Sequence, residues 1–379
     1  MQLSLYFLFD MLIYIILFFS LFLSLIIKTN TSFCIWKFNF SSLQLFRVFF
    51  LIMFILVSFR DLSVGTDTNH YDYGFGQIVN NEFNFSNNPY SAPLYYLLCY
   101  LCGYFTNNGI SIRIIQAAVT YYCFYKLILK NSPSIFLSLF LFICYGYFAK
   151  SMNGSRHIMA ISIALYSIYS FYFEKRRLLS LTLLLIAILI HIASAIVILI
   201  HFLNFFYRNQ KSLTSIFLSS ILVALIFNCM YKYGCYIISE YIVHYKIYTN
   251  EGERINIIVN NTSGVVAYLF MFYLSIILIY VHKVKVYPAH DFTKIILPFI
   301  TIFSFWGLLN PFNEIIMRVI LVSNMLLVCI LMPNVVKFLK YKERVVYVAL
   351  VIAASIFYFF YDLVLSNGSG VVPYTFISF

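Results

Sequence analysis

Charged residues are scarce in this chain of 379 residues, and that scarcity excludes a soluble globular protein. Only 10% of the residues are charged, whereas 63% are hydrophobic and the mean hydropathy is +0.90. Apolar runs of about 15 to 25 residues recur along the chain, and such runs can cross the hydrocarbon core of a membrane as helices. The composition therefore predicts an all-α, polytopic integral membrane protein with about ten to twelve transmembrane helices.

Several other signals are missing. The eight cysteines lack the spacing of a zinc site or a disulfide framework, and we expect neither a metal ion nor another cofactor. The first 28 residues lack a basic n-region and a cleavage site, so we expect a retained helix and not a signal peptide. The sequence contains no internal repeat, proline-rich linker or soluble segment, which predicts a single polytopic membrane domain over residues 1–379.

Basic residues outnumber acidic ones by 25 to 13, giving a net charge of +12. In a multi-pass protein such an excess marks cytoplasmic loops, so nucleic acid is excluded as a partner. With 174–177 and 337–344 in the cytoplasm, residues 178–207 begin and end there, which predicts a helical hairpin whose tip lies near His191. Residues 93–105 are too short to cross and are expected to be a re-entrant piece.

This topology places 17 of the 25 basic residues but only three of the 13 acidic residues on the inner side. That distribution follows the positive-inside rule. Both termini and two long regions, residues 60–109 and 231–263, then face outward. Chemistry on the water side is expected in these two outer regions.

The first outer region opens with the sequence SFRDLSVGTDTNHYDYGF, residues 58–75, in which charged and polar residues are dense. Gly65 permits a tight turn. Thr66 and Thr68 can bond to the local backbone, so Asp67 between them would be held at the membrane surface in a pose that suits a general base. Arg60 and Asp72 lie in the same stretch. The alternative is an ordinary outer loop with scattered charge.

A second polar stretch, residues 150–177, places Arg156 and His157 at the outer start of a helix. The arginine can be an anchor that snorkels to the interface, or its planar fork can bind a phosphate at the helix N-terminus. Asn153 precedes it and is expected to supply capping. His157 points about 100° around the helix from Arg156, so it ranks lower as a ligand for the same group.

Three further positions carry weaker signals. His191 lies within a long apolar run, where an ionisable residue is either functional or a neutral histidine bonded to a neighbouring helix. Arg254 belongs to a tyrosine-rich outer loop whose composition suits contacts with sugars or an ordered cap. Arg318 follows Glu314 by four residues, which predicts an ion pair along one helix face or a part of the site.

These motifs give the chain a resemblance to the EpsG family of exopolysaccharide proteins, which includes many Wzy-type polymerases. The stretch from Arg60 to Tyr71 is similar to that family's pattern R-x-x-x-V-G-T-D-T-x-x-Y. The segments PLYYLL (93–98), N-x-x-R at Asn153 and HIASAI with His191 also agree in order over residues 45–205. Two departures are Ser91 and Ala92, where the family often has Glu, and His157, where Gln is common.

The resemblance implies a fold like that of the glycosyltransferase-C enzymes and a polymerase in the bacterial inner membrane. Its substrates would be oligosaccharide repeat units linked to undecaprenyl pyrophosphate, joined at the periplasmic face. Asp67 would activate the acceptor hydroxyl, and Arg156, with Arg60 or His191, would stabilise the leaving pyrophosphate. The expected substrate-binding residues are Thr66, Thr68, Tyr71, Asp72, Asn153, His157, Arg254 and Arg318. Membrane lipids and a chain-length regulator are the other expected partners.

Two functions from other classes compete with this interpretation. A flippase for the same lipid-linked units is expected to carry charges at the membrane midplane and a two-halved repeat, and neither is evident in the sequence. A membrane O-acyltransferase that modifies surface glycan would use His191 or His157 as its base, but it leaves the loop around Asp67 unexplained.

Overall fold

The computed structural model describes residues 11–26, 33–35, 38–80, 92–210, 212–241, 255–284, 291–311 and 314–377. The chain forms two compact units. The first consists of Met1–Ala195, Val328–Val336 and Lys340–Phe379, and the second of Ile196–Leu327 and Lys337–Leu339.

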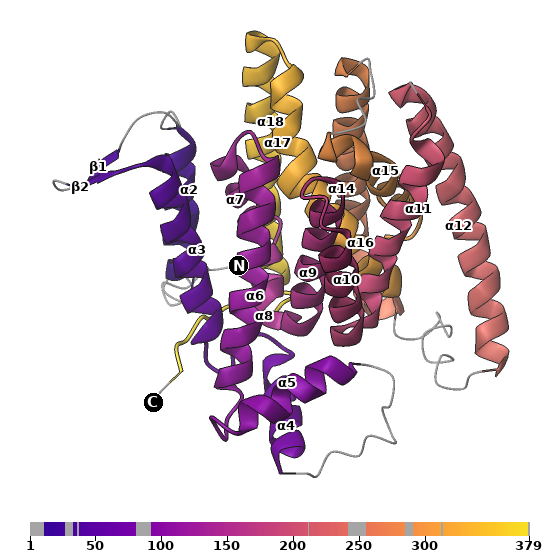
Figure 1. Ribbon diagram of the computed structural model, residues 1–379. Helices are drawn as coiled ribbons and strands as arrows, with labels where there is room; N and C mark the ends of the chain where they lie inside the picture. Colours follow the sequence, from indigo (N-terminus) through magenta and orange to yellow (C-terminus); the bar gives the residue numbers. More distant parts are fainter. Residues whose placement is uncertain are drawn as a thin grey trace. The chain divides into compact units, whose positions relative to one another are not determined.

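Helices dominate the first unit (Figure 1). Its α-helices are α2 (Leu12–Ile26), α3 (Ser42–Ser58), α4 (Thr68–Val79), α5 (Pro93–Gly103), α6 (Ile110–Asn131), α7 (Ile135–Cys144), α8 (Tyr147–Asn153), α9 (Ser155–Tyr172), α10 (Arg177–Ile190), α17 (Met332–Val335) and α18 (Tyr341–Phe360). A small antiparallel pair of strands, β1 (Phe33–Ile35) and β2 (Phe38–Phe40), has Phe33 opposite Phe40. The helices of the second unit are α11 (Ile198–Tyr207), α12 (Leu213–Tyr241), α14 (Ile255–Lys283), α15 (Phe292–Leu309) and α16 (Glu314–Leu326).

Short non-α turns connect some of these helices. The 3₁₀ segments are Ile192–Val197 and Val336–Phe338, and the π-helical segments are Leu327–Leu331 and Tyr361–Ser366.

The helices confirm an all-α, multi-pass membrane protein. Among the described residues, six helices are long and apolar enough to cross a membrane, and a seventh span results if α7 and α8, bent by 56°, count as one. Five shorter apolar helices, including α3, α5 and α10, are also present among the described residues, and the number of ten to twelve transmembrane helices stays a prediction. The bend between α7 and α8 lies at Gly146, whose φ of +73° is readily available only to glycine.

Two apolar segments, residues 93–105 and 178–207, have lengths that do not match one membrane span. The predicted re-entrant piece is α5, a helix of only 11 residues. The long apolar run 178–207 breaks where predicted: α10 ends at Ile190, His191 is extended with φ −157° and ψ 116°, and a 3₁₀ turn follows.

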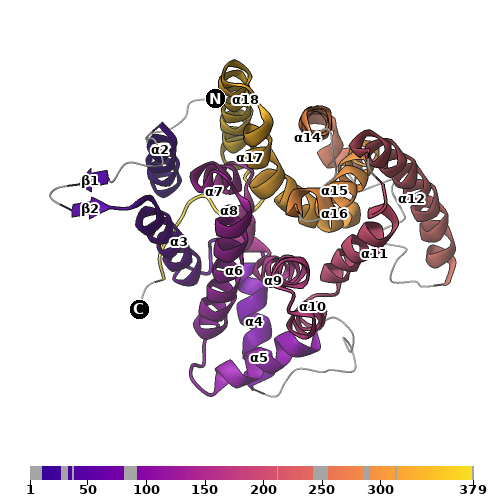
Figure 2. The ribbon, with the colours of Figure 1, turned by 45° about the horizontal axis from the view of Figure 1, so that its top comes forward.

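Helix α9 is the core of the first unit and lies between α6 and α10 (Figure 2). Its side chains are almost all buried, including those of Ser162 and Ser167. These hydroxyls donate to carbonyls three residues back, Met159 O at 2.7 Å and Ala164 O at 2.6 Å, so no water is needed to satisfy them. The carbonyl of Ser167 also accepts from Ser180 of α10 at 2.7 Å, which fixes the register of the two helices.

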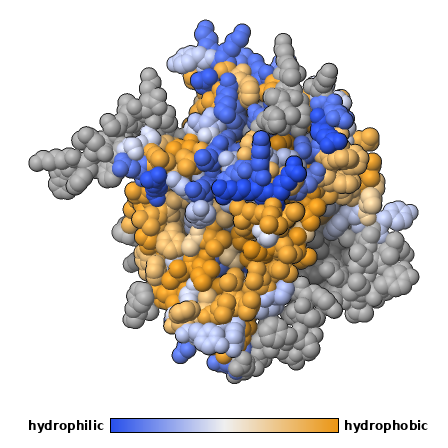
Figure 3. Space-filling model, viewed as in Figure 1, coloured by the Kyte–Doolittle hydropathy of each residue, from blue (hydrophilic) through white to orange (hydrophobic). Residues whose placement is uncertain are grey.

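The two ends of the first unit differ in charge. Helix α6 starts next to α4 and carries Lys130 in its last turn, and the turn after α9 leads to Arg176, which caps α10. Figure 1 shows α4 and α5 together at the lower end of this unit, and Figure 3 shows hydrophilic side chains gathered toward its upper end, above a broad apolar band. The GTDT loop, residues 65–68, therefore lies at the end away from these basic residues.

Candidate functional site

The C-terminal segment, residues 367–377, holds the GTDT loop in place. Gly65 adopts φ +92° and its N–H donates to Gly370 O at 2.8 Å, while Thr66 N–H donates to Ser369 O at 3.3 Å. Asp61 N–H donates to Thr375 O at 2.9 Å. Residues about 300 positions apart in the sequence thus form a short ladder, which the sequence analysis did not anticipate.

Asp67 stands at the N-terminus of α4, where Asn153 fixes its backbone. The side-chain oxygen of Asn153 accepts hydrogen bonds from Asp67 N–H at 2.8 Å and from the Thr66 hydroxyl at 2.9 Å. Asp67 is half-buried, and its carboxylate makes no capping hydrogen bond to α4. The backbone of Asp67 is therefore fixed, and its carboxylate is not committed to capping its own helix, so it is available as a general base.

Asn153 itself departs from the role predicted for it. Helix α9 starts at Ser155, as the sequence indicated, but its cap is Gly154 and has no side-chain capping bond. The amide of Asn153 instead joins the GTDT loop to the start of α9. This contact connects the two most polar stretches of the sequence.

Arg60 is fully buried, and its donors point to protein acceptors. Its Nη2 donates to Met152 O at 2.7 Å, its Nη1 to Val57 O, and its Nε contacts Thr68 Oγ1 at 3.4 Å. Burial lowers the pKa of Arg60 to about 10, with a smaller contribution from Arg113, and the guanidinium stays charged at pH 7. This geometry favours a positioning role, in which Arg60 ties α3, α4 and α8 together.

Arg156 faces the aromatic side chains of α4 and α5. Its guanidinium carbon lies 6.0 Å from the ring centre of Tyr71 and 5.3 Å from that of Tyr95. The two rings are themselves in contact, with centroids 6.4 Å apart and planes at 65°. Among the described residues, Arg156 Nε has no hydrogen-bond partner. The two rings contact the guanidinium, so the N–H groups along its edge stay available to bind an anion.

The two histidines singled out from the sequence pair with each other. The rings of His157 and His191 stack with centroids 4.4 Å apart and planes at 7°. His191 Nδ1 accepts the N–H of Ala193 at 3.2 Å, which puts the proton of a neutral ring on Nε2. The stack brings the end of α10 to the start of α9, so His191 and Arg156 lie at the same end of the unit.

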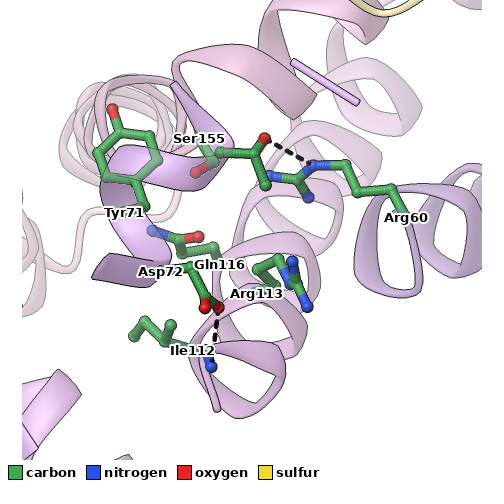
Figure 4. A pocket seen from close by; sticks show the side chains of 9 residues that line it. Arg60, Tyr71, Asp72, Ile112, Arg113, Gln116 and Ser155 are labelled. Carbon is green, nitrogen blue, oxygen red and sulfur yellow. Dashed lines mark hydrogen bonds between the residues drawn. The ribbon is translucent and has the colours of Figure 1, made fainter. Parts of the chain in front are cut away.

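A small cleft, with room for a group about the size of one water molecule, opens between α4, α6 and α9. Asp72, Arg113 and Gln116 are among the residues that line it (Figure 4). Asp72 Oδ1 accepts the N–H of Gly109 at 3.0 Å, which positions the carboxylate at the start of α6. The remaining lining residues are Arg60, Thr68, Tyr71, Gly109, Ile112 and Ser155.

Neither Arg113 nor Gln116 was named from the sequence as a site residue. They lie in a segment that was interpreted only as an apolar span. Their spacing of three residues on one helix face is the signal that could have identified them.

For two other predicted site residues, Arg254 and Arg318, a role in the site stays a prediction. Arg254 lies outside the described residues, and so does the side chain of Glu314. Arg318 is exposed on α16 of the second unit, so the predicted pair with Glu314 stays a prediction. Within the described part of the chain, no three His, Cys, Asp or Glu side chains could together hold a metal ion.

The bond between Asn153 and Asp67 yields a direct prediction. Asn153→Ala leaves the half-buried N–H of Asp67 without an acceptor and should destabilise the protein by about 1–3 kcal/mol. Thr66→Val removes only the exposed bond to the same oxygen and should cost less than about 1 kcal/mol. Thermal unfolding of both variants in detergent measures the difference, and equal midpoints would contradict the proposed anchor.

One of three comparisons with known proteins gives a match. No curated protein and no solved structure matches the chain. The EpsG family matches residues 43–376, a range that includes the GTDT loop, the start of α9 and almost all of the C-terminal segment. The match extends well beyond the residues 45–205 over which the motifs suggested it. The chain therefore belongs to the EpsG family, a family of Wzy-like polymerases.

Proposed function

We propose that this polymerase-like membrane protein of polysaccharide biosynthesis joins oligosaccharide repeat units linked to undecaprenyl pyrophosphate. The observation that carries the proposal is the hydrogen bond from Asp67 N–H to the Asn153 side chain, because it joins the carboxylate loop to the helix of Arg156. Arg156 lies one turn after Asn153 and packs on Tyr71, one turn after Asp67. A base and a cation are thus available at one end of the unit.

In the proposed reaction, Asp67 accepts the proton of the hydroxyl on the acceptor's terminal sugar. The resulting oxygen nucleophile attacks the anomeric carbon of the donor. A new glycosidic C–O bond forms as the bond between that carbon and the pyrophosphate oxygen breaks. The lipid pyrophosphate leaves with the electron pair, and Arg156 stabilises its negative charge.

Two features support a site on the periplasmic face of the bacterial inner membrane. The GTDT loop lies at the end of the first unit away from Lys130 and Arg176. Basic residues collect on the cytoplasmic side of multi-pass proteins, so the opposite end faces the periplasm. His191 at the same end would orient the pyrophosphate. Membrane lipids and a chain-length regulator are the further partners that we propose.

Analysis of the lipid-linked and surface glycan in a deletion strain tests the function. We expect single repeat units on the surface glycan's lipid anchor and no long-chain ladder, with recovery when the intact chain is supplied. Loss of all repeat units from the anchor would indicate a flippase instead. A full ladder of altered mass would indicate an O-acyltransferase, and an unchanged ladder would contradict all three functions.

A further inference from the structure

The cleft between α4, α6 and α9 contains buried polar atoms that the proposed reaction does not use. Arg113 is 5% exposed and Gln116 is 2% exposed. Within the described residues, Arg113 Nε and Nη1 and both polar atoms of the Gln116 amide have no hydrogen-bond partner. The hydroxyl of Ser155, 1% exposed, has none either.

Buried polar groups without hydrogen bonds destabilise the folded protein. An unsatisfied buried donor or acceptor costs about 1–3 kcal/mol, and native proteins keep few of them. The cost is concentrated here on three residues that line one hollow. These polar atoms make no hydrogen bond within the described chain, and all three residues line the same cleft. We infer from this that a ligand completes their hydrogen bonds.

The chemistry of the cleft favours a neutral ligand that both donates and accepts. Arg113 is a donor only, Gln116 is both donor and acceptor, and the carboxylate of Asp72 accepts. Arg113 and Asp72 interact electrostatically, and within the described residues Arg113 Nε and Nη1 make no hydrogen bond. A phosphate would be repelled by Asp72, whereas a single hydroxyl of a sugar ring can donate to the carboxylate and accept from the guanidinium.

We propose that Asp72, Arg113 and Gln116 form a subsite for one hydroxyl of a neutral pyranose ring. This inference rests on the proposed function and names the part of its substrate that the cleft recognises. Asp72 follows Asp67 by five residues on α4, about 7.5 Å along the helix axis. Tyr71 both lines the cleft and packs against Arg156, so a sugar held in the cleft lies beside the proposed reaction centre, and the subsite selects which sugar is extended.

Gln116→Leu is the most informative variant, because a ligand-binding role and a structural role predict opposite results. The amide makes no bond within the described chain, so an apolar side chain of similar size should leave the unfolding midpoint unchanged or raise it. Sugar binding should fall at least tenfold. Ser304→Ala is the control, since that hydroxyl is also buried and makes no hydrogen bond within the described residues, but lies on α15 of the second unit.

Binding is measured on the full chain in detergent by saturation-transfer NMR. The probes are methyl glycosides of glucose, galactose, mannose and N-acetylglucosamine, with inorganic phosphate as competitor. We expect at least one glycoside to bind, to be lost in Gln116→Leu and Arg113→Met, and to survive in Ser304→Ala. Displacement by phosphate, absence of binding by every glycoside, or a lowered midpoint in Gln116→Leu would overturn the subsite.

This assay contains no lipid-linked substrate and requires no turnover. Its outcome is therefore separate from the fate of the proposed polymerase activity. An unchanged ladder in the deletion strain would remove the proposed function while the NMR result still reports on the cleft. A lost ladder without glycoside binding would remove only the subsite.

Discussion

Replacing Asp67 by Asn should abolish long-chain polymer while leaving the protein folded. A general base contributes about 10² to 10⁴ to a rate, and the amide cannot accept the proton of the acceptor hydroxyl. Asn is a good residue at a helix N-terminus, and the carboxylate makes no capping bond to α4, so stability should change little. The measurements are the glycan ladder on a gel and the rate at which purified protein converts lipid-linked repeat units.

Asp61→Asn provides the matched control on the same loop. The Asp61 carboxylate accepts the N–H of Ser63 at 3.0 Å, and the backbone and hydroxyl of Ser63 lower the pKa of Asp61. The same chemical change at this position should leave the ladder intact. A ladder that persists in Asp67→Asn would remove the proposed base. Loss of the folded protein in that variant would instead assign Asp67 a structural role.

Local sequence features predicted the framework of the site well. The dense polar residues after an apolar run located the loop that contains Asp67, and the change in character near residue 155 located the start of α9. The break at His191 followed from the length of the apolar run combined with charge placement. Each of these inferences depends on residues close together in the chain, where hydrophobic periodicity and charge carry the information.

Contacts between residues far apart in the sequence could not be predicted from local hydrophobicity and charge. The C-terminal segment binds the GTDT loop mainly through backbone groups, as in the bond from Gly65 N–H to Gly370 O. Backbone hydrogen bonds leave no signature in side-chain type, and the partners lie about 300 residues apart. The cleft residues Arg113 and Gln116 were missed for a related reason, because the face that a helix presents to its neighbours depends on packing.

Arg60 shows most clearly what could not be predicted from the sequence. The sequence placed a cation beside Asp67, which suggested that Arg60 binds the leaving pyrophosphate. In the structure, its guanidinium donates to Val57 O and Met152 O and contacts Thr68. A residue's neighbours in sequence identify the charge but not the acceptors that surround it after folding.

We therefore expect Arg60→Lys to lower the folding stability of the protein and not to act directly on the reaction. The lysine keeps the charge, but its single ammonium cannot reach acceptors on three separate segments, and a buried cation with unmet partners costs about 3–5 kcal/mol. We expect a strongly lowered unfolding midpoint and little folded protein after extraction in detergent. Arg47→Lys is the control, because Arg47 is exposed and, among the described residues, donates to Tyr125 Oη alone, at 3.2 Å, so its change should stay within about 0.5 kcal/mol.

The opposite outcome would restore the role suggested by the sequence. If Arg60→Lys keeps the wild-type midpoint but loses polymer, the guanidinium acts on substrate and its contacts to Val57 and Met152 are incidental. Growth at low temperature separates the two cases, since a destabilised variant recovers its ladder when enough of it folds, whereas a variant that lacks a substrate ligand does not. Recovery at low temperature would identify Arg60 as the residue that holds α3, α4 and α8 in register, so that Asp67 and Arg156 can face the same substrate.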